Sequence, residues 1–517
     1  MNGGAMENWG LVIYVQRYLL LDKTLSGPSN LLVTSSIISH EVAHDWYGNT
    51  ITTDWWDSIV INEGVANYLM YSSLLKIYPE WKMEQFIMLA VQKVILHDIE
   101  FGDYPIINLN LQKSEDIHQI FNTIVYNKGM SIFFMIEQLM GYDVLQQKLS
   151  NFVKINENKT VNIKQFENHL AKNVRDVPIY DILYSWMRKC GNVIIFCYLN
   201  ENKTQIIVEQ ILAKKYYTDK MDIENCNNTN IELQGYSKLI FAIKLFEYID
   251  KESEYLVWRN YYYSYAYLNA MFTETETMEY INKKFRDKII ISKEYDIDKK
   301  HEFLDLHGRK LNELIYSLSL KVNVSKSVDM ASKEYSEWAL NNKVLNRDYI
   351  QSIFFYVVEH GNYTVFETIY DELKRGSDFV YSDMFIYAPL LTQNVTQFRF
   401  YLDFLFLSTE INPYQFRIDT MFAYICNNKK MIPEIISFFV ENVTNLQIIQ
   451  LFESFVNTFH VYVRNEDEKN LLYSTIKRFK DLKVLSSDFT TLDFMITMNL
   501  NFIEKNKDEL VEYYQYY

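Results

Sequence analysis

The chain has 517 residues and a formal net charge of −15. This acidity argues against a nucleic-acid-binding protein, because phosphate binding requires a basic surface. Only 14 glycines and 7 prolines occur, well below the usual shares of about 7% and 5%, which favours long helices over a turn-rich all-β fold. No window of eighteen apolar residues occurs, so the sequence predicts no membrane-spanning segment.

The chain begins with a glycine-rich stretch, in which Gly3, Gly4 and Gly10 fall among the first ten residues. Such clustering indicates backbone that turns tightly or approaches a ligand. Glu7 stands in the middle of this stretch and is a candidate binding group. A polar terminus without a specific role is the alternative.

A metal-binding pattern follows, from His40 to Glu63. His40 and His44 belong to a His-Glu-x-x-His motif, and their spacing of four places both on one face of a helix. Two imidazole nitrogens can then reach one ion about 2 Å away, and Glu63 is the natural third ligand of a catalytic zinc. In this motif Glu41 is the general base. Two core histidines bonded to backbone carbonyls are the alternative.

Apolar spacing predicts helices up to residue 189 and strands directly after Gly191. Helices are expected over 64–74, 81–97, 114–125, 129–141 (with Gly141 as its C-cap), 142–155, 163–174 and 181–189. Strands are expected over 193–199 and 205–209, with 239–245, 254–258 and 261–267 as further candidates. From 271 onward, apolar stripes recur at helical spacing over 349–359, 379–391, 398–408, 431–441 and 446–458.

Three motifs together resemble the zinc aminopeptidases of the aminopeptidase N family (gluzincins). They are Gly4-Ala5-Met6-Glu7-Asn8, the His40–His44 motif with Glu63, and Tyr126-Asn127-Lys128-Gly129. The resemblance is clear over residues 1 to about 190. It implies a mostly α chain with a thermolysin-like catalytic domain over 1–190, a small β-sandwich over 191–270 and an armadillo/HEAT-like helical-repeat domain over 271–517. An ordinary helical bundle is the alternative for the last part.

The resemblance also implies a role for each motif. One zinc ion per chain would be bound by His40, His44 and Glu63. The catalytic residues would be Glu41, as general base, and Tyr126, whose hydroxyl would stabilise the oxyanion. The substrate-binding residues would be Gly4, Ala5, Met6, Glu7 and Asn8. Among these, Glu7 would pair with the α-ammonium of a peptide that has a free N-terminus.

The chain departs from the family pattern in two places. Met70 stands where the family often has an acidic residue, and loss of such an outer-shell partner can cost about 10–100-fold in metal affinity or activity. The catalytic domain also lacks the family's first strands and the β-rich domain before them, so we expect a truncated product. One rival reading is therefore a catalytically impaired scaffold that binds peptides or partners. Another is a related zinc hydrolase that also acts on a lipid epoxide, against which Ala5 argues.

The cysteines and the glycosylation sequons indicate in which cellular compartment the protein is expected. Cys190, Cys197, Cys226 and Cys426 form no Cys-x-x-Cys pair, so no second metal site is expected. Cys190 and Cys197 could bridge in an extracellular protein, and reduced thiols are the alternative. Several Asn-x-Ser/Thr sequons favour an extracellular or cell-surface protein, with the cytoplasm as the alternative.

Overall fold

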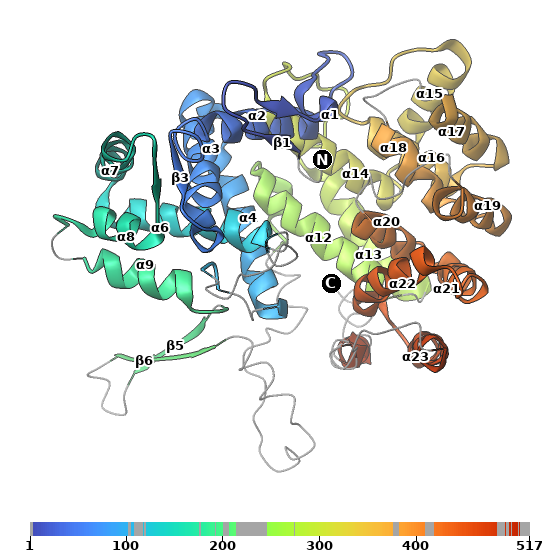
Figure 1. Ribbon diagram of the computed structural model, residues 1–517. Coiled ribbons are helices and arrows are strands. Elements are labelled where there is room, and N and C mark those ends of the chain that lie inside the picture. The colour runs from blue at the N-terminus through green and yellow to red at the C-terminus, as the bar shows by residue number, and fades with distance from the viewer. Residues whose placement is uncertain are drawn as a thin grey trace. The chain divides into compact units, whose positions relative to one another are not determined.

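The computed structural model describes most of the chain. The described residues are 4–101, 105–107, 117, 120–174, 177–191, 193–199, 206–212, 246–272, 275–375, 382–408, 418–482, 492, 496–497, 499–504 and 506. They are mostly helical (Figure 1), which confirms the predicted class. Gly3, Cys226, the strand expected over 239–245 and residues 114–116 and 118–119 of the helix expected over 114–125 lie outside these residues.

The chain forms two compact units, and each unit consists of three separate segments of the sequence. The N-terminal unit comprises residues 1–21, 29–230 and 304–307, and the C-terminal unit comprises 22–28, 231–303 and 308–517. None of the helices within the described ranges is both long and apolar enough to cross a membrane. In the same ranges no disulfide joins Cys190 to Cys197.

Apart from the helix expected over 114–125, the N-terminal unit contains each helix that the sequence predicted there. Its α-helices are α1 (Gln16–Leu19), α2 (Pro28–Ala43), α3 (Glu63–Ile77), α4 (Met83–Phe101), α6 (Gly129–Met140), α7 (Tyr142–Ile155), α8 (Ile163–Ala171) and α9 (Ile179–Arg188). Two 3-10 turns, η1 (Trp56–Ile61) and η2 (Pro79–Trp81), lie beside α3, and the π-helical turn η3 (Ile124–Lys128) leads into α6. Gly141 ends α6 with φ of 88°, which confirms the predicted C-cap.

Strands are few, and among the described residues they pair only two by two. At the front, β1 (Ala5–Met6) and β2 (Ile13–Tyr14) form an antiparallel pair, and Gly10, with φ of 78°, lies in the turn between them. Further along, β3 (Ile51–Thr53) runs parallel to β4 (Lys159–Val161). The strands predicted after Gly191 are confirmed as the antiparallel pair β5 (Val193–Leu199) and β6 (Ile206–Leu212).

The strands predicted over 254–258 and 261–267 are wrong, because these residues belong to helix α12 (Tyr255–Met271). The buried side chains on this helix recur every three or four residues, at Trp258, Tyr261, Tyr265 and Leu268. Tyrosine and tryptophan favour strands only weakly, and burial of one helical face overrides that preference. Among the described residues the expected β-sandwich is thus represented by β5 and β6 alone, and the three-domain division stays a prediction.

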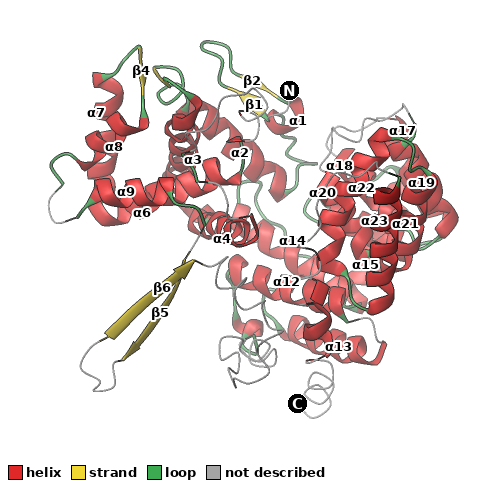
Figure 2. Ribbon diagram, turned by 60° about the horizontal axis from the view of Figure 1, so that its bottom comes forward, coloured by secondary structure: helices red, strands yellow, loops and turns green. Residues whose placement is uncertain are grey.

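The C-terminal unit is built from consecutive helices (Figure 2). After α12 come α13 (Thr275–Ile291), α14 (Leu306–Lys321), α15 (Ser325–Asn341), α16 (Ile350–His360), α17 (Tyr363–Arg375), α18 (Ser382–Tyr387), α19 (Val395–Phe406), α20 (Ile418–Asn427), α21 (Ile432–Glu441), α22 (Leu446–Phe459) and α23 (Glu466–Asp481). The five stripes predicted in this region are confirmed as α16, α18 with the 3-10 turn η6 (Ala388–Leu391), α19, α21 and α22. Stacked rings such as Phe452 and Phe479, with centroids 4.2 Å apart, fill the core between them.

In the N-terminal unit two glycines let α3 approach the start of α6. A Cβ atom built on Gly64 would lie 2.7 Å from Val60 Cγ2 and 3.3 Å from Gly129 Cα. A Cβ atom on Gly129 would lie 3.1 Å from Gly64 Cα. Only glycine fits so close a contact between two backbones. Because Glu63 precedes Gly64 and Tyr126 lies three residues before Gly129, this contact also sets the spacing of those two side chains.

We predict that Gly64→Ala lowers the free energy of unfolding by about 1–3 kcal/mol, as overpacking of a core does. Urea denaturation measures this loss. Val60 is the nearest obstacle to the new methyl group, so the double variant with Val60→Ala should lose less than the sum of the two single losses. Strictly additive losses would mean that the new methyl group does not meet Val60.

Candidate metal centre

The two histidines of the motif and Glu63 converge on one point. His44 follows the last residue of α2, and its amide still donates to the His40 carbonyl at 3.2 Å, so the helical spacing of four is kept. The Nε2 atoms of His40 and His44 are 3.0 Å apart. Glu63 begins α3, and its Oε2 lies 3.3 Å from His40 Nε2 and 3.5 Å from His44 Nε2. These three side chains could together hold a metal ion.

The charges at this point suit a cation. Burial alone would raise the pKa of Glu63, yet hydrogen bonds from His40 and His44 lower that pKa to about 2. Burial alone would lower the pKa of His44, but Glu63 outweighs it and raises the pKa to about 9. A carboxylate that stays ionised while nearly buried requires positive charge beside it. Two neutral imidazoles and one carboxylate are a donor set typical of a catalytic zinc.

A second contact fixes which nitrogen of His44 faces the centre. His44 Nδ1 lies 2.7 Å from the carbonyl oxygen of Tyr47. A carbonyl can only accept, so Nδ1 carries a proton, and Nε2 is the nitrogen that would bind a metal ion after giving up its own proton. Gly48 stands next to this contact with φ of 146°, and a Cβ atom there would lie 3.0 Å from His44 Nδ1. We did not predict Tyr47 or Gly48 as site residues, although Gly48 lies only four residues after His44.

Glu41 lies beside the ligands with one oxygen unused. Its side chain is 6% exposed, and Oε2 has no hydrogen-bond partner among the described residues. Burial is the main cause that raises the pKa of Glu41 to about 7. A buried polar atom normally has a partner, and an ion with its water at the adjacent ligand cluster would provide one. The residues present therefore fit a hydrated metal ion.

Glu7 reaches the same cluster from the front of the chain. Its Oε1 lies 4.0 Å from His44 Nδ1, and Glu7, Glu41 and His44 offer ligand atoms within 4.8 Å of one another. The Asn49 side chain, which we did not predict, donates to the Glu7 carbonyl oxygen at 2.8 Å. This bond ties the β1 end to the loop after the motif. A second carboxylate, close to the metal ligands but outside the set of three, is thus held in place.

The other front residues lie along β1. Gly4 accepts a hydrogen bond from the Val15 amide at 2.9 Å, and Ala5 pairs with Tyr14 across the strands. Met6 and Asn8 have exposed side chains. Of the five residues predicted to contact substrate, Glu7 is the one whose side chain the structure brings to the ligands.

Tyr126 is held over the ligands by the π-helical turn η3. The centroid of its ring lies 5.8 Å from that of His40. Burial, together with the Glu63 carboxylate, raises the pKa of Tyr126 well above its usual value, so the hydroxyl keeps its proton. Asn67 on α3 donates to the Tyr126 carbonyl oxygen at 3.2 Å. The sequence did not single out Asn67.

The end of η3 is anchored by a buried ion pair. Lys128 Nζ donates to Asp98 Oδ2 at 2.7 Å, and both side chains are almost fully buried.

Met70, which stands where the family often has an acidic residue, is buried on α3. An apolar, buried side chain therefore occupies the position at which the family often has an acidic residue.

Two family models match the chain, one in each half. Residues 1–186 match the Peptidase family M1 domain, and residues 233–486 match the ERAP1-like C-terminal domain. Aminopeptidase M1 of Arabidopsis thaliana is 29% identical over 211 residues, which is 41% of this chain and 24% of that protein. Aminopeptidase 2, mitochondrial, of Saccharomyces cerevisiae is 34% identical over 199 residues, which is 38% of this chain and 20% of that protein.

The thyrotropin-releasing hormone-degrading ectoenzyme of Homo sapiens is 32% identical over 213 residues, 40% of this chain and 20% of that protein. The matched part thus spans a quarter or less of the length of these relatives. Their names include an ectoenzyme and a mitochondrial enzyme, so the similar proteins occur in different compartments. With both domain matches in the expected order, the chain belongs to peptidase family M1, the aminopeptidase N family.

Proposed function

We propose that the chain is a zinc-dependent aminopeptidase that hydrolyses the first peptide bond of peptides with a free N-terminus. One observation carries this proposal: Glu7, Glu41 and the three convergent ligands His40, His44 and Glu63 form one cluster of interacting charges. One zinc ion per chain fits this donor set. When bound, zinc would act as a Lewis acid toward water and toward the scissile carbonyl.

Glu41 would be the general base. Its Oε2 atom is buried and has no hydrogen-bond partner among the described residues, and burial raises the pKa of Glu41 to about 7. A carboxylate with a pKa near the working pH can accept a proton from the attacking water and later deliver it to the leaving amine. Neither a metal ligand nor an exposed carboxylate would serve equally well in both steps.

Tyr126 would stabilise the negative charge that develops on the carbonyl oxygen. Because burial and Glu63 keep its hydroxyl protonated, Tyr126 can donate a hydrogen bond at neutral pH. The Asn67 bond and the turn η3 hold the tyrosine backbone in place before substrate arrives. Such preorganisation is what makes an oxyanion partner effective.

Glu7 would select for a free amine. Its carboxylate lies on the His44 side of the cluster and is fixed through the Asn49 bond to its carbonyl oxygen. A charge-assisted hydrogen bond to an α-ammonium favours a substrate whose first residue sits at the metal. An acylated N-terminus cannot make this ion pair. The rival reading, a catalytically impaired scaffold that binds peptides, would require none of these groups for its function.

We predict that Glu41→Gln lowers kcat on an aminoacyl chromogenic amide by about 10²–10⁴-fold, the usual contribution of a general base. Zinc content should stay near one per chain, because Glu41 is not among the three ligands. The charge-matched control is Glu80→Gln at an exposed position of η2, which should retain wild-type kcat. Loss of zinc from the Glu41 variant would contradict its assignment as the base, and a wild-type chain without turnover would favour the scaffold.

We predict that Glu7→Gln lowers kcat/KM for peptides with a free N-terminus by about 10–100-fold, the worth of a hydrogen bond to a charged group. Hydrolysis of the matched N-acetylated peptides, already slow, should change little, so the ratio between the two substrates is the measurement. Equal losses on both substrates would instead assign Glu7 to folding or metal binding. Glu80→Gln serves again as the control for charge.

A further inference from the structure

A pair of buried charges in the N-terminal unit takes no part in the proposed mechanism. Lys128 Nζ donates to Asp98 Oδ2 at 2.7 Å and to the Gly191 carbonyl oxygen at 3.4 Å. The Lys128 and Asp98 side chains are 3% and 1% exposed. Such a pair adds little net stability, because taking two charges out of water offsets most of their attraction. Its directional, charge-assisted bond nevertheless fixes the two backbones that carry it.

Lys128 ends η3, the π-helical turn that carries Tyr126, and Asp98 lies on α4. Tyr126 meets the metal ligands, since the centroid of its ring lies 5.8 Å from that of His40. Side chains two positions apart on a helical turn do not face each other. Lys128 accordingly reaches α4 and not the ligands. The ion pair therefore fastens the turn on a side other than the one that faces the ligands.

Further contacts of η3 also come from side chains. Asn122 Oδ1 accepts a hydrogen bond from the Ile124 amide at 2.8 Å at the start of the turn. Asn67, on α3, donates to the Tyr126 carbonyl oxygen at 3.2 Å. Turns with π-helical bonds are rare and occur frequently at functional sites. The backbone at Tyr126 is thus held from α3 and, through the ion pair, from α4, and all of these contacts lie inside the N-terminal unit.

We propose that Lys128 and Asp98 are positioning residues for Tyr126, and that their ion pair places the tyrosine hydroxyl where the oxyanion develops. The inference rests on the proposed function, in which Tyr126 is the group that meets this charge. A hydrogen-bond donor is most effective when its position is fixed before the charge develops. Movement of η3 relative to α4 would separate two buried charges, and the ion pair opposes it for that reason. A misplacement of about 1 Å can cost about 100-fold in rate.

Replacing both charges with apolar side chains tests the proposal without leaving a buried charge unpaired. The double variant Lys128→Met with Asp98→Leu, called the pair swap, keeps similar shapes and should fold, as such replacements often do. It should lower kcat on an aminoacyl chromogenic amide by about 10–100-fold. KM should stay within about twofold, because the oxyanion contact is made only in the transition state.

The decisive measurement repeats the pair swap in a Tyr126→Phe chain. There it should lower kcat by less than about twofold, because the hydroxyl that the ion pair positions is already absent. General loosening of the N-terminal unit would instead lower kcat by the same factor in both backgrounds. Equal losses in the two backgrounds, or an unchanged kcat after the pair swap alone, would overturn the proposal.

Asp98→Asn keeps the proposal testable if the pair swap fails to fold. The amide oxygen can still accept a hydrogen bond from Lys128, but the charge is gone. This variant should lower kcat by a smaller factor than the pair swap, again only where Tyr126 is present. An unchanged kcat in Asp98→Asn would then overturn the proposal.

A matched control lies in the same unit. Glu167 on α8 is fully buried, and Arg188 on α9 donates to its Oε2 from Nη2 at 3.0 Å. Among the described residues neither side chain bonds to η3. Replacing both with methionine removes a buried ion pair much as the pair swap does. The control should keep kcat within about twofold of wild type, because it leaves the oxyanion partner in place. A loss as large as that of the pair swap would overturn the proposal.

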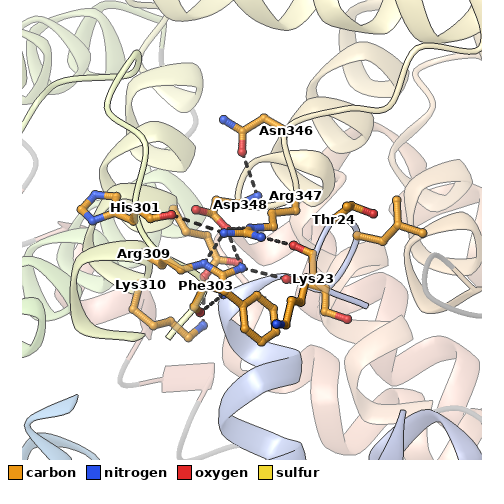
Figure 3. A network of polar contacts seen from close by, with 12 residues as sticks. Lys23, Thr24, His301, Phe303, Arg309, Lys310, Asn346, Arg347 and Asp348 are labelled. Atoms are coloured by element: carbon orange, nitrogen blue, oxygen red, sulfur yellow. Dashed lines mark hydrogen bonds and ion pairs between the residues drawn. The ribbon is translucent and has the colours of Figure 1, made fainter. Parts of the chain in front are cut away.

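A buried ion pair of the C-terminal unit provides a second control (Figure 3). Arg309 is 0% exposed, and its Nε donates to Asp348 Oδ1 at 2.8 Å. Its Nη1 donates to the Phe303 carbonyl oxygen at 2.7 Å, within the same unit. Asp348→Asn should lower the midpoint of thermal unfolding, because it leaves a buried charge poorly compensated. At a temperature where circular dichroism shows it folded, its kcat should equal that of wild type. A fall in kcat as large as that of the pair swap would overturn the proposal.

Amide hydrogen exchange of residues 122–130 tests the hold on η3 without any turnover. The pair swap should speed exchange in this segment by about tenfold or more while α3 stays protected. The control at Glu167 and Arg188 should leave exchange there unchanged, and equal exchange in wild type and pair swap would overturn the proposal. A wild-type chain that hydrolyses no peptide refutes the proposed function, and exchange then decides this inference alone. Hydrolysis by wild type that the pair swap leaves unchanged refutes the inference and not the function.

Discussion

A buried carboxylate between two imidazoles is the interaction on which the N-terminal unit depends. Burial raises the pKa of Glu63, but hydrogen bonds and charge interactions with His40 and His44 outweigh burial and lower this pKa to about 2. Without positive charge at this point, its burial would be strongly unfavourable. A bound divalent ion meets the same need and leaves both histidines neutral. Stability and metal binding therefore draw on the same three side chains, and ligand variants are expected to affect both.

Several local features of the backbone position the side chains of the metal centre. Contact between Gly64 and Gly129 brings α3 close to the end of η3, and the Tyr126 side chain interacts with Glu63. The Tyr47 carbonyl orients His44. Each feature is a backbone constraint that acts on a side chain several residues away. Together they explain how a site made of short motifs can depend on residues outside those motifs.

The sequence predicted those parts of the structure that follow from local spacing. His40 and His44 are four residues apart on a helix, and the apolar stripes of α16, α19, α21 and α22 follow helical spacing, so both were predictable. The strands predicted within α12 failed because aromatic residues suit either a strand or a buried helical face. Asn49 and Gly48 were missed for another reason. Their roles depend on a backbone angle or on contacts with residues distant in sequence, and one chain alone gives no signal for either.

The most direct test of the central claim is anomalous diffraction from crystals of the full chain, recorded at the zinc absorption edge. The account predicts one peak per chain, about 2.0–2.2 Å from the Nε2 atoms of His40 and His44 and from an oxygen of Glu63. Glu41 should lie outside bonding distance of that peak. No peak at this position, in crystals grown with zinc and with His40, His44 and Glu63 still bonded directly to one another, would contradict the account.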